Sequence, residues 1–238
     1  MNEYNENQAE FYFGIGNQIV KEGIFERFPE LRPAVGYPNY WRKDGKHNKM
    51  LLVGESNYFD DRDIPYSDFL DAEKWYKAED AKLIPEYAQT KVSNNIGGYP
   101  TFNKFFKIMS NVLNEAGIEH FTGLGEAAFY NYFLRPAYND GKHKGFIPQN
   151  IDREVSGIAL SGILERINPD LVIFLSKKAY TEFGKFCKRN NVVYENIVIE
   201  HVSHPASIWW NRDGGIRGKV KFEQLLKEYW INKQSGNK

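Results

Sequence analysis

The sequence is poor in cysteine, and this excludes several kinds of site at once. Cys187 is the only cysteine among the 238 residues. A single cysteine cannot form a disulfide within the chain. It also cannot supply the set of thiolates that a cysteine-based zinc or iron–sulfur centre requires. We therefore expect a protein without an iron–sulfur cluster. As a separate prediction, we expect no bound cofactor.

The chain also lacks an excess of either charge and lacks long apolar runs. Lys and Arg together number 31, and so do Asp and Glu, so net charge gives no general attraction to nucleic acid. No apolar run reaches the ~18 residues of a membrane span. The segment MNEYNENQAEFYF at 1–13 has neither the basic nor the apolar region of a signal peptide. We expect a cytoplasmic protein with no membrane partner.

Apolar residues are abundant, at 42% of the chain, which is sufficient for a large core. Four short apolar segments predict strands over 50–55, 127–134, 170–176 and 196–202. Apolar residues at helical spacing predict helices over 7–25, 155–167, 178–189 and 219–230, and another that Thr101 caps. This alternation predicts an α/β fold with three α/β/α layers and a short, mainly parallel four-stranded sheet.

Polar residues gather where the predicted strands end. The first strand leads into GESNY at 54–58, and Asn131 lies in the second. Lys177 and Lys178 follow the third strand, and HPAS at 204–207 follows the fourth. Because ligands bind beyond the carboxyl ends of parallel strands, we expect a carboxylate, an amide and an imidazole to meet at one edge of the sheet.

In their order and spacing these motifs resemble those of the uracil-DNA glycosylase superfamily. GESNY at 54–58 resembles the family's first motif, and HPAS at 204–207 resembles its second. YNYFLRP at 130–136 resembles the strand that carries a base-reading asparagine. NPDLVIFLSKKAY at 168–180 is similar to the family's strand and helix that precede the second motif.

The resemblance covers roughly residues 50–210 and implies one uracil-DNA glycosylase-like domain over 1–238, with a helical extension over about 1–45. It implies a metal-independent base-excision repair enzyme that binds single- or double-stranded DNA. Such an enzyme hydrolyses the N-glycosidic bond of a flipped uracil or of a modified or damaged base.

This reaction leaves negative charge on the base and positive charge on the sugar, and two residues are predicted to be catalytic. His204 is expected to donate a hydrogen bond to the base carbonyl. Glu55 is expected to stabilise the sugar cation or to position water. Asn131 suits the reading of a base edge, because an amide both donates and accepts. In the family, an aromatic residue at the place of Tyr58 excludes thymine.

The remaining predicted contacts are with the base and with DNA. Gly54, Ser56 and Phe59 are expected to complete the base site. The ring that stacks on the base is left open among Phe59, Tyr66 and Phe102. The predicted DNA contacts are Ser207, Ile208, Trp209, Arg212, Lys177 and Lys178. Ile208 or Trp209 is expected to wedge into the DNA stack. The segment that follows is rich in cations and would form a basic lip, meaning a basic surface beside the site. It contains Arg212, Arg217, Lys219 and Lys221, with Asp213 as the acid among them.

Two departures from the family pattern keep other functions open. Ser56 stands where many members have Asp or Asn, and Ala206 stands where the second motif has Ser. Ser56 and the acidic segment 59–80 raise the alternative of an inactive module of the same fold that binds nucleic acid or a nucleotide. Asp60, Asp61 and Asp63 raise a third alternative, a metal-dependent nuclease or hydrolase, although no partner motif accompanies them.

Overall fold

The computed structural model describes residues 25, 31–35, 40, 45–59, 71–77, 100–120, 123–138, 146–212 and 218–231. Its strands are β1 (Ala34–Val35), β2 (Met50–Phe59), β3 (Ala128–Tyr138), β4 (Leu171–Phe174) and β5 (Val198–His201). Its helices are α5 (Ala72–Lys77), α7 (Pro100–Glu115), α8 (Asn150–Ile167), α9 (Lys177–Asn190) and α10 (Lys219–Leu225). Most of the predicted helix 7–25 and of the extension 1–45 lies outside these residues, as do Tyr66, Asp60, Asp61 and Asp63.

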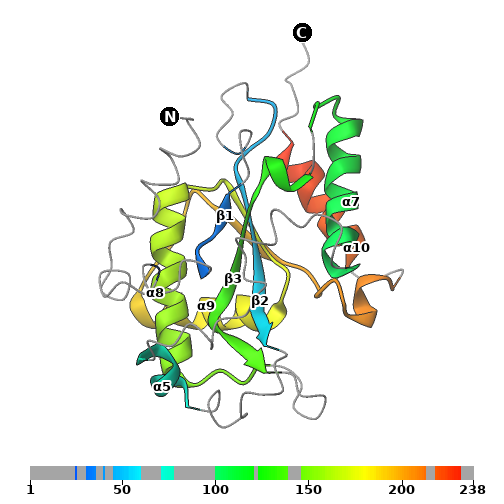
Figure 1. Ribbon diagram of the computed structural model, residues 1–238. Coiled ribbons are helices and arrows are strands. Elements are labelled where there is room, and N and C mark those ends of the chain that lie inside the picture. The colour runs from blue at the N-terminus through cyan, green and yellow to red at the C-terminus, as the bar shows by residue number, and fades with distance from the viewer. Residues whose placement is uncertain are drawn as a thin grey trace, which may run out of the picture.

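The strands form one mostly parallel sheet in the order β1-β3-β2-β4-β5 (Figure 1). β3, β2, β4 and β5 are mutually parallel, and β1 adds an antiparallel edge to β3. The prediction of an α/β fold with a mainly parallel sheet is therefore confirmed, but the count of four strands was one too low. β1 has only two residues, which is too short to show an alternating pattern.

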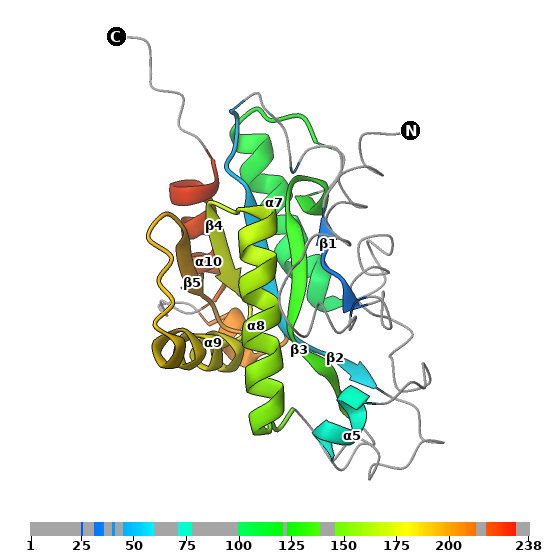
Figure 2. The same ribbon diagram turned by 90° about the vertical axis from the view of Figure 1, so that its left-hand side faces the viewer.

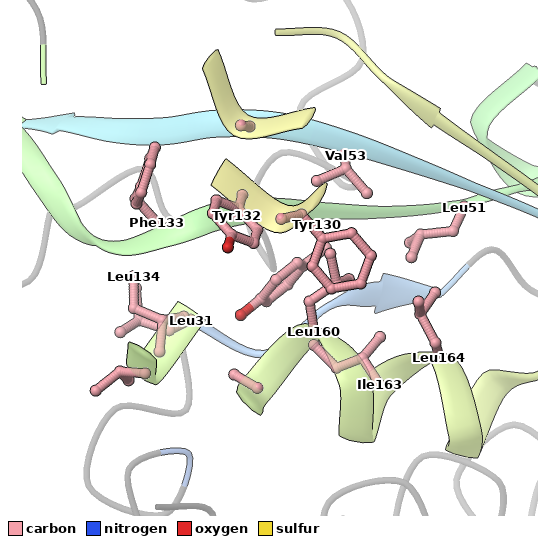
Figure 3. Packing of buried hydrophobic residues seen from close by; sticks show 14 of the residues in the cluster. Leu31, Leu51, Val53, Tyr130, Tyr132, Phe133, Leu134, Leu160, Ile163 and Leu164 are labelled. Carbon is pink, nitrogen blue, oxygen red and sulfur yellow. The ribbon is translucent and has the colours of Figure 1, made fainter. Parts of the chain in front are cut away.

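Helices cover both faces of the sheet and make the three layers. Leu51 and Val53 belong to a core with α8 and α9, while Met50 and Leu52 belong to a second core with α7 and α10. Figure 1 shows α8 on one side of the sheet and α7 and α10 on the other, and Figure 2 looks onto the α8 side. Figure 3 shows strand residues packed against Leu160 and its neighbours in α8. This division follows from the alternation of side chains along a strand.

No helix in the described ranges is long and apolar enough to cross a membrane.

The register sets the strand ends level with one another. Val53 lies opposite Phe174, and Phe174 lies opposite His201. The residues that follow Phe174 and His201 therefore leave the sheet at one edge, where β2 is paired only with β3. β2 continues along β3 to Phe59, four residues beyond the end predicted at 55, with an irregularity between Ser56 and Tyr58. Pro136 lies opposite this irregularity, and it has no N–H for the ladder.

Candidate active site

Glu55 is held at the edge of the sheet by two donors from the neighbouring strand end. The Ser176 hydroxyl donates to Glu55 Oε2 at 2.6 Å, and Lys178 Nζ donates to Oε1 at 2.7 Å. Ser176 is also the N-cap of α9 and accepts from the Ala179 N–H at 3.3 Å. Since both oxygens of Glu55 accept hydrogen bonds, the arrangement suits a carboxylate anion. The positive end of the α9 dipole favours the same charge.

His204 lies in the segment after β5, and its contacts fix the position of its proton. Nδ1 accepts a hydrogen bond from the Ala206 N–H at 3.1 Å, so the neutral ring carries its proton on Nε2. Burial lowers the pKa of His204; the Glu55 carboxylate raises it and the Lys104 ammonium lowers it further. Lys104 Nζ also donates to the Pro205 carbonyl at 2.9 Å, which ties α7 to this segment. The site therefore contains a neutral imidazole within electrostatic reach of an anion.

The lowered pKa of His204 predicts an acid-sensitive fold. An unfolded histidine takes up its proton near pH 6.5, whereas folded His204 takes it up only at lower pH. Acid therefore favours the unfolded state as the pH falls through this interval. As the pH is lowered from 7.5 to the onset of acid unfolding, the melting temperature of His204→Gln should therefore fall less than that of the wild type.

The matched control is His120→Gln, which removes another histidine, one bonded to the Ile118 carbonyl at 3.0 Å. It should keep the wild-type dependence on pH. Parallel curves for the wild type and His204→Gln, measured by thermal unfolding at a series of pH values, would contradict the assignment.

Asn131 lies directly across from Gly54, and its amide is fixed. Asn131 Nδ2 donates to Asn57 Oδ1 at 2.8 Å, and both side chains are buried. A Cβ added at Gly54 would lie 2.1 Å from Asn131 Oδ1. The glycine therefore provides the space that the asparagine amide occupies.

One of the three predicted stacking rings contacts Phe129, a neighbour of Gly54. The ring of Phe102, in the first turn of α7, is 5.3 Å from the ring of Phe129. Phe129 Cζ in turn lies 3.1 Å from the Cβ position of Gly54. Ser56 is half-buried in β2, on the same face as Gly54 by strand alternation. The backbones of Tyr58 and Phe59 end β2, but their side chains lie outside the described part of the structure.

The segment after His204 presents an apolar pair to solvent. The Ser207 hydroxyl accepts from the Trp209 N–H at 3.2 Å and so caps the short 3₁₀ turn Ile208–Trp210. Ile208 is 68% exposed and Trp209 is 54% exposed, whereas Trp210 is buried in the core. The Arg212 guanidinium stacks over the Trp209 ring at 4.3 Å. An exposed aromatic ring with a cation on its face thus lies close in sequence to the candidate catalytic histidine.

The lysines of the predicted basic lip differ from one another. Lys177 is exposed at the start of α9, and Lys219 is exposed at the start of α10. Lys221 forms an ion pair with Glu200 at 2.7 Å, so part of its charge is neutralised. Arg217 and Asp213 lie outside the described residues.

The structure brings some of the predicted residues together and leaves others apart. Glu55 and His204 come from strand ends far apart in sequence, but they are close enough for the Glu55 carboxylate to raise the pKa of His204. Asn131 is the cross-strand neighbour of Gly54, the residue before Glu55. Strand alternation nevertheless directs Asn131 toward the α7 face and Glu55 toward the α9 face. Within the described ranges, no hydrogen bond or ion pair joins Asn131 to Glu55 or His204.

Three residues of the site were not predicted from the sequence. Ser176 had an available signal, since a serine between an apolar strand and a helix is a common N-cap. Asn57 lies inside the GESNY motif, but only the hydrogen bond between the two side chains shows that it contacts Asn131. Lys104 had no signal, because it is one of many exposed lysines on a helix.

Metal ligation has no support in the described part of the chain, where no group of three or more His, Cys, Asp or Glu side chains could hold an ion. No protein-family model matches the chain, and no curated protein matches it either. The function is therefore inferred from the side chains at the edge of the sheet.

Proposed function

We propose that this protein is a DNA glycosylase that hydrolyses the N-glycosidic bond of a flipped uracil or modified base. The main support is the combination of the Glu55 carboxylate with a neutral His204 whose proton is on Nε2. The order of motifs that resembles the uracil-DNA glycosylase superfamily agrees with this proposal. The parallel order β3-β2-β4-β5 places those motifs at one edge.

The two groups divide the charges that form as the bond breaks. The bonding electrons leave with the base, and the Nε2–H of His204 donates to the base oxygen on which negative charge develops. The sugar acquires positive charge at C1′, which the Glu55 anion stabilises. A carboxylate has about four acceptor positions, and Ser176 and Lys178 each use one. The remaining positions suit the water that attacks C1′.

Asn131 and Phe102 would define the base site. Asn57 takes one hydrogen of the Asn131 amide, so the second hydrogen and Oδ1 remain to read the edge of a base. Of the three stacking candidates, Phe102 is the one whose side chain lies in the described part of the structure, and its ring contacts that of Phe129. The exposed Ile208 and Trp209 suit insertion into the space that a flipped nucleotide leaves.

The test is an excision assay. The protein is incubated with duplex and single-stranded oligonucleotides that carry uracil, hypoxanthine or modified cytosines, and alkali then cleaves the strand at each abasic site. We expect scission on at least one substrate, none on the unmodified sequence, and no loss of activity in EDTA. Folded protein that yields no scission on any substrate would refute the proposal. Salt-dependent DNA binding without scission would favour the inactive module, and loss of activity in EDTA would favour the metal-dependent alternative.

A further inference from the structure

Lys178 was expected to contact DNA, and its side chain is 40% exposed, but its Nζ is bound to acceptors of the protein itself. Its Nζ donates to Glu55 Oε1 at 2.7 Å and to the Phe146 carbonyl at 2.9 Å. An ammonium group has three N–H donors, so two of them are occupied by acceptors of the protein itself. We propose that Lys178 is a positioning residue that, together with Ser176, fixes the Glu55 carboxylate. The proposal rests on the proposed function insofar as Glu55 is catalytic.

The second attachment point of Lys178 is itself rigidly held. The Arg135 guanidinium lies over the Phe146 ring at 4.6 Å and donates to the next carbonyl, that of Ile147, at 3.1 Å. Arg135 also forms a two-point ion pair with Asp152, at 2.9 and 2.6 Å, and both side chains are buried. Lys178 therefore connects the end of β2 to an anchored segment before α8, and Glu55 is held between Lys178 and Ser176.

Lys178 has less capacity for a phosphate contact than an unpaired lysine. Two of its three N–H donors are occupied, and its charge is paired with that of Glu55. Lys177 is adjacent in sequence and exposed, and within the described ranges it has no hydrogen bond or ion pair. Lys177 is thus the better phosphate ligand of the two. The ion pair at 2.7 Å makes Lys178 a charge partner of Glu55.

The kinetic test compares Lys178→Met, Lys178→Arg and Lys188→Met on the preferred oligonucleotide. Lys178→Met should lower kcat by about 10- to 100-fold through misplacement of Glu55, with little change in KM. Lys178→Arg should recover most of kcat, because it keeps the charge and several donors. Lys188→Met, which removes an exposed lysine near the far end of α9, is the matched control and should behave as the wild type.

Salt dependence separates positioning from phosphate binding. Lys178→Met should leave the slope of log K against log salt unchanged, whereas Lys177→Met should reduce it by about one. A reduced slope for Lys178→Met with normal kcat would overturn the proposal, and so would normal values of both quantities.

A double-mutant cycle in thermal unfolding tests the pair without any excision activity. Glu55→Gln and Lys178→Met should each lower the melting temperature. The double variant should lose less than the sum of these two losses, because either substitution alone already breaks the contact. Additive losses would show that the contact is absent and would overturn the inference. Coupled losses in a protein that excises no base would refute the proposed function alone.

Discussion

Glu55→Gln is expected to lower base excision by about 100- to 1,000-fold while the protein remains folded. The substitution keeps the shape of the side chain but removes the charge that stabilises the sugar cation. It also disturbs the local hydrogen bonds. Ser176 and Lys178 both donate to Glu55, whereas a glutamine amide has one oxygen and one NH2 group. One of the two donors then faces another donor.

The rate is best measured under single-turnover conditions with excess enzyme, so that product release does not hide the chemical step. Glu182→Gln is the matched control, because Glu182 also pairs with two cations, Arg153 and Lys185, each at 2.8 Å. The Arg153 contact joins α8 to α9, and neither cation contacts Glu55, so Glu182→Gln should excise at the wild-type rate. If Glu55→Gln kept that rate with a normal unfolding curve, Glu55 would have no catalytic part.

The sequence predicted the fold best where burial is uniform. β4 is covered on both faces, and its unbroken apolar run marks it clearly between Asp170 and Ser176. The continuation of β2 to Phe59 was not predicted, because its residues after Gly54 are polar and are paired only with β3. Their strand conformation depends on a partner distant in sequence, which a local pattern cannot show.

The site was predictable to a similar degree. The strand ends predicted Glu55, Asn131 and His204 as candidates, because parallel strands bring their carboxyl ends to one edge. The alternation of side chains, however, turns Asn131 and Glu55 to opposite faces of the sheet. The contacts of these residues were not predictable, since they depend on side-chain conformations and on distant segments. Lys178 shows the difference. Its position after a strand suggested a DNA contact, but a position in the sequence could not predict that its Nζ bonds to Glu55 and to the Phe146 carbonyl.

Gly54→Ala is expected to destabilise the protein by about 2–4 kcal/mol, whatever the function of the site. The new Cβ would lie 2.1 Å from Asn131 Oδ1 and 3.1 Å from Phe129 Cζ. The amide must therefore move, and its buried hydrogen bond to Asn57 is lost with the movement. Denaturant unfolding measures the change. Gly184→Ala, in α9, is the matched control, because a Cβ there meets nothing within 4 Å. It should stabilise the protein by about 0.5–1 kcal/mol.

The double variant Gly54→Ala/Asn131→Ala identifies the cause of the loss. Truncating Asn131 removes the atom that a Cβ at position 54 would strike, so the double variant should be more stable than Gly54→Ala alone. In the wild-type background, Asn131→Ala should instead destabilise the protein, because it removes a buried hydrogen bond and leaves a small space. The sign of the Asn131→Ala effect therefore reverses with the residue at 54. An effect of the same sign in both backgrounds would mean that the amide does not occupy the space above Gly54.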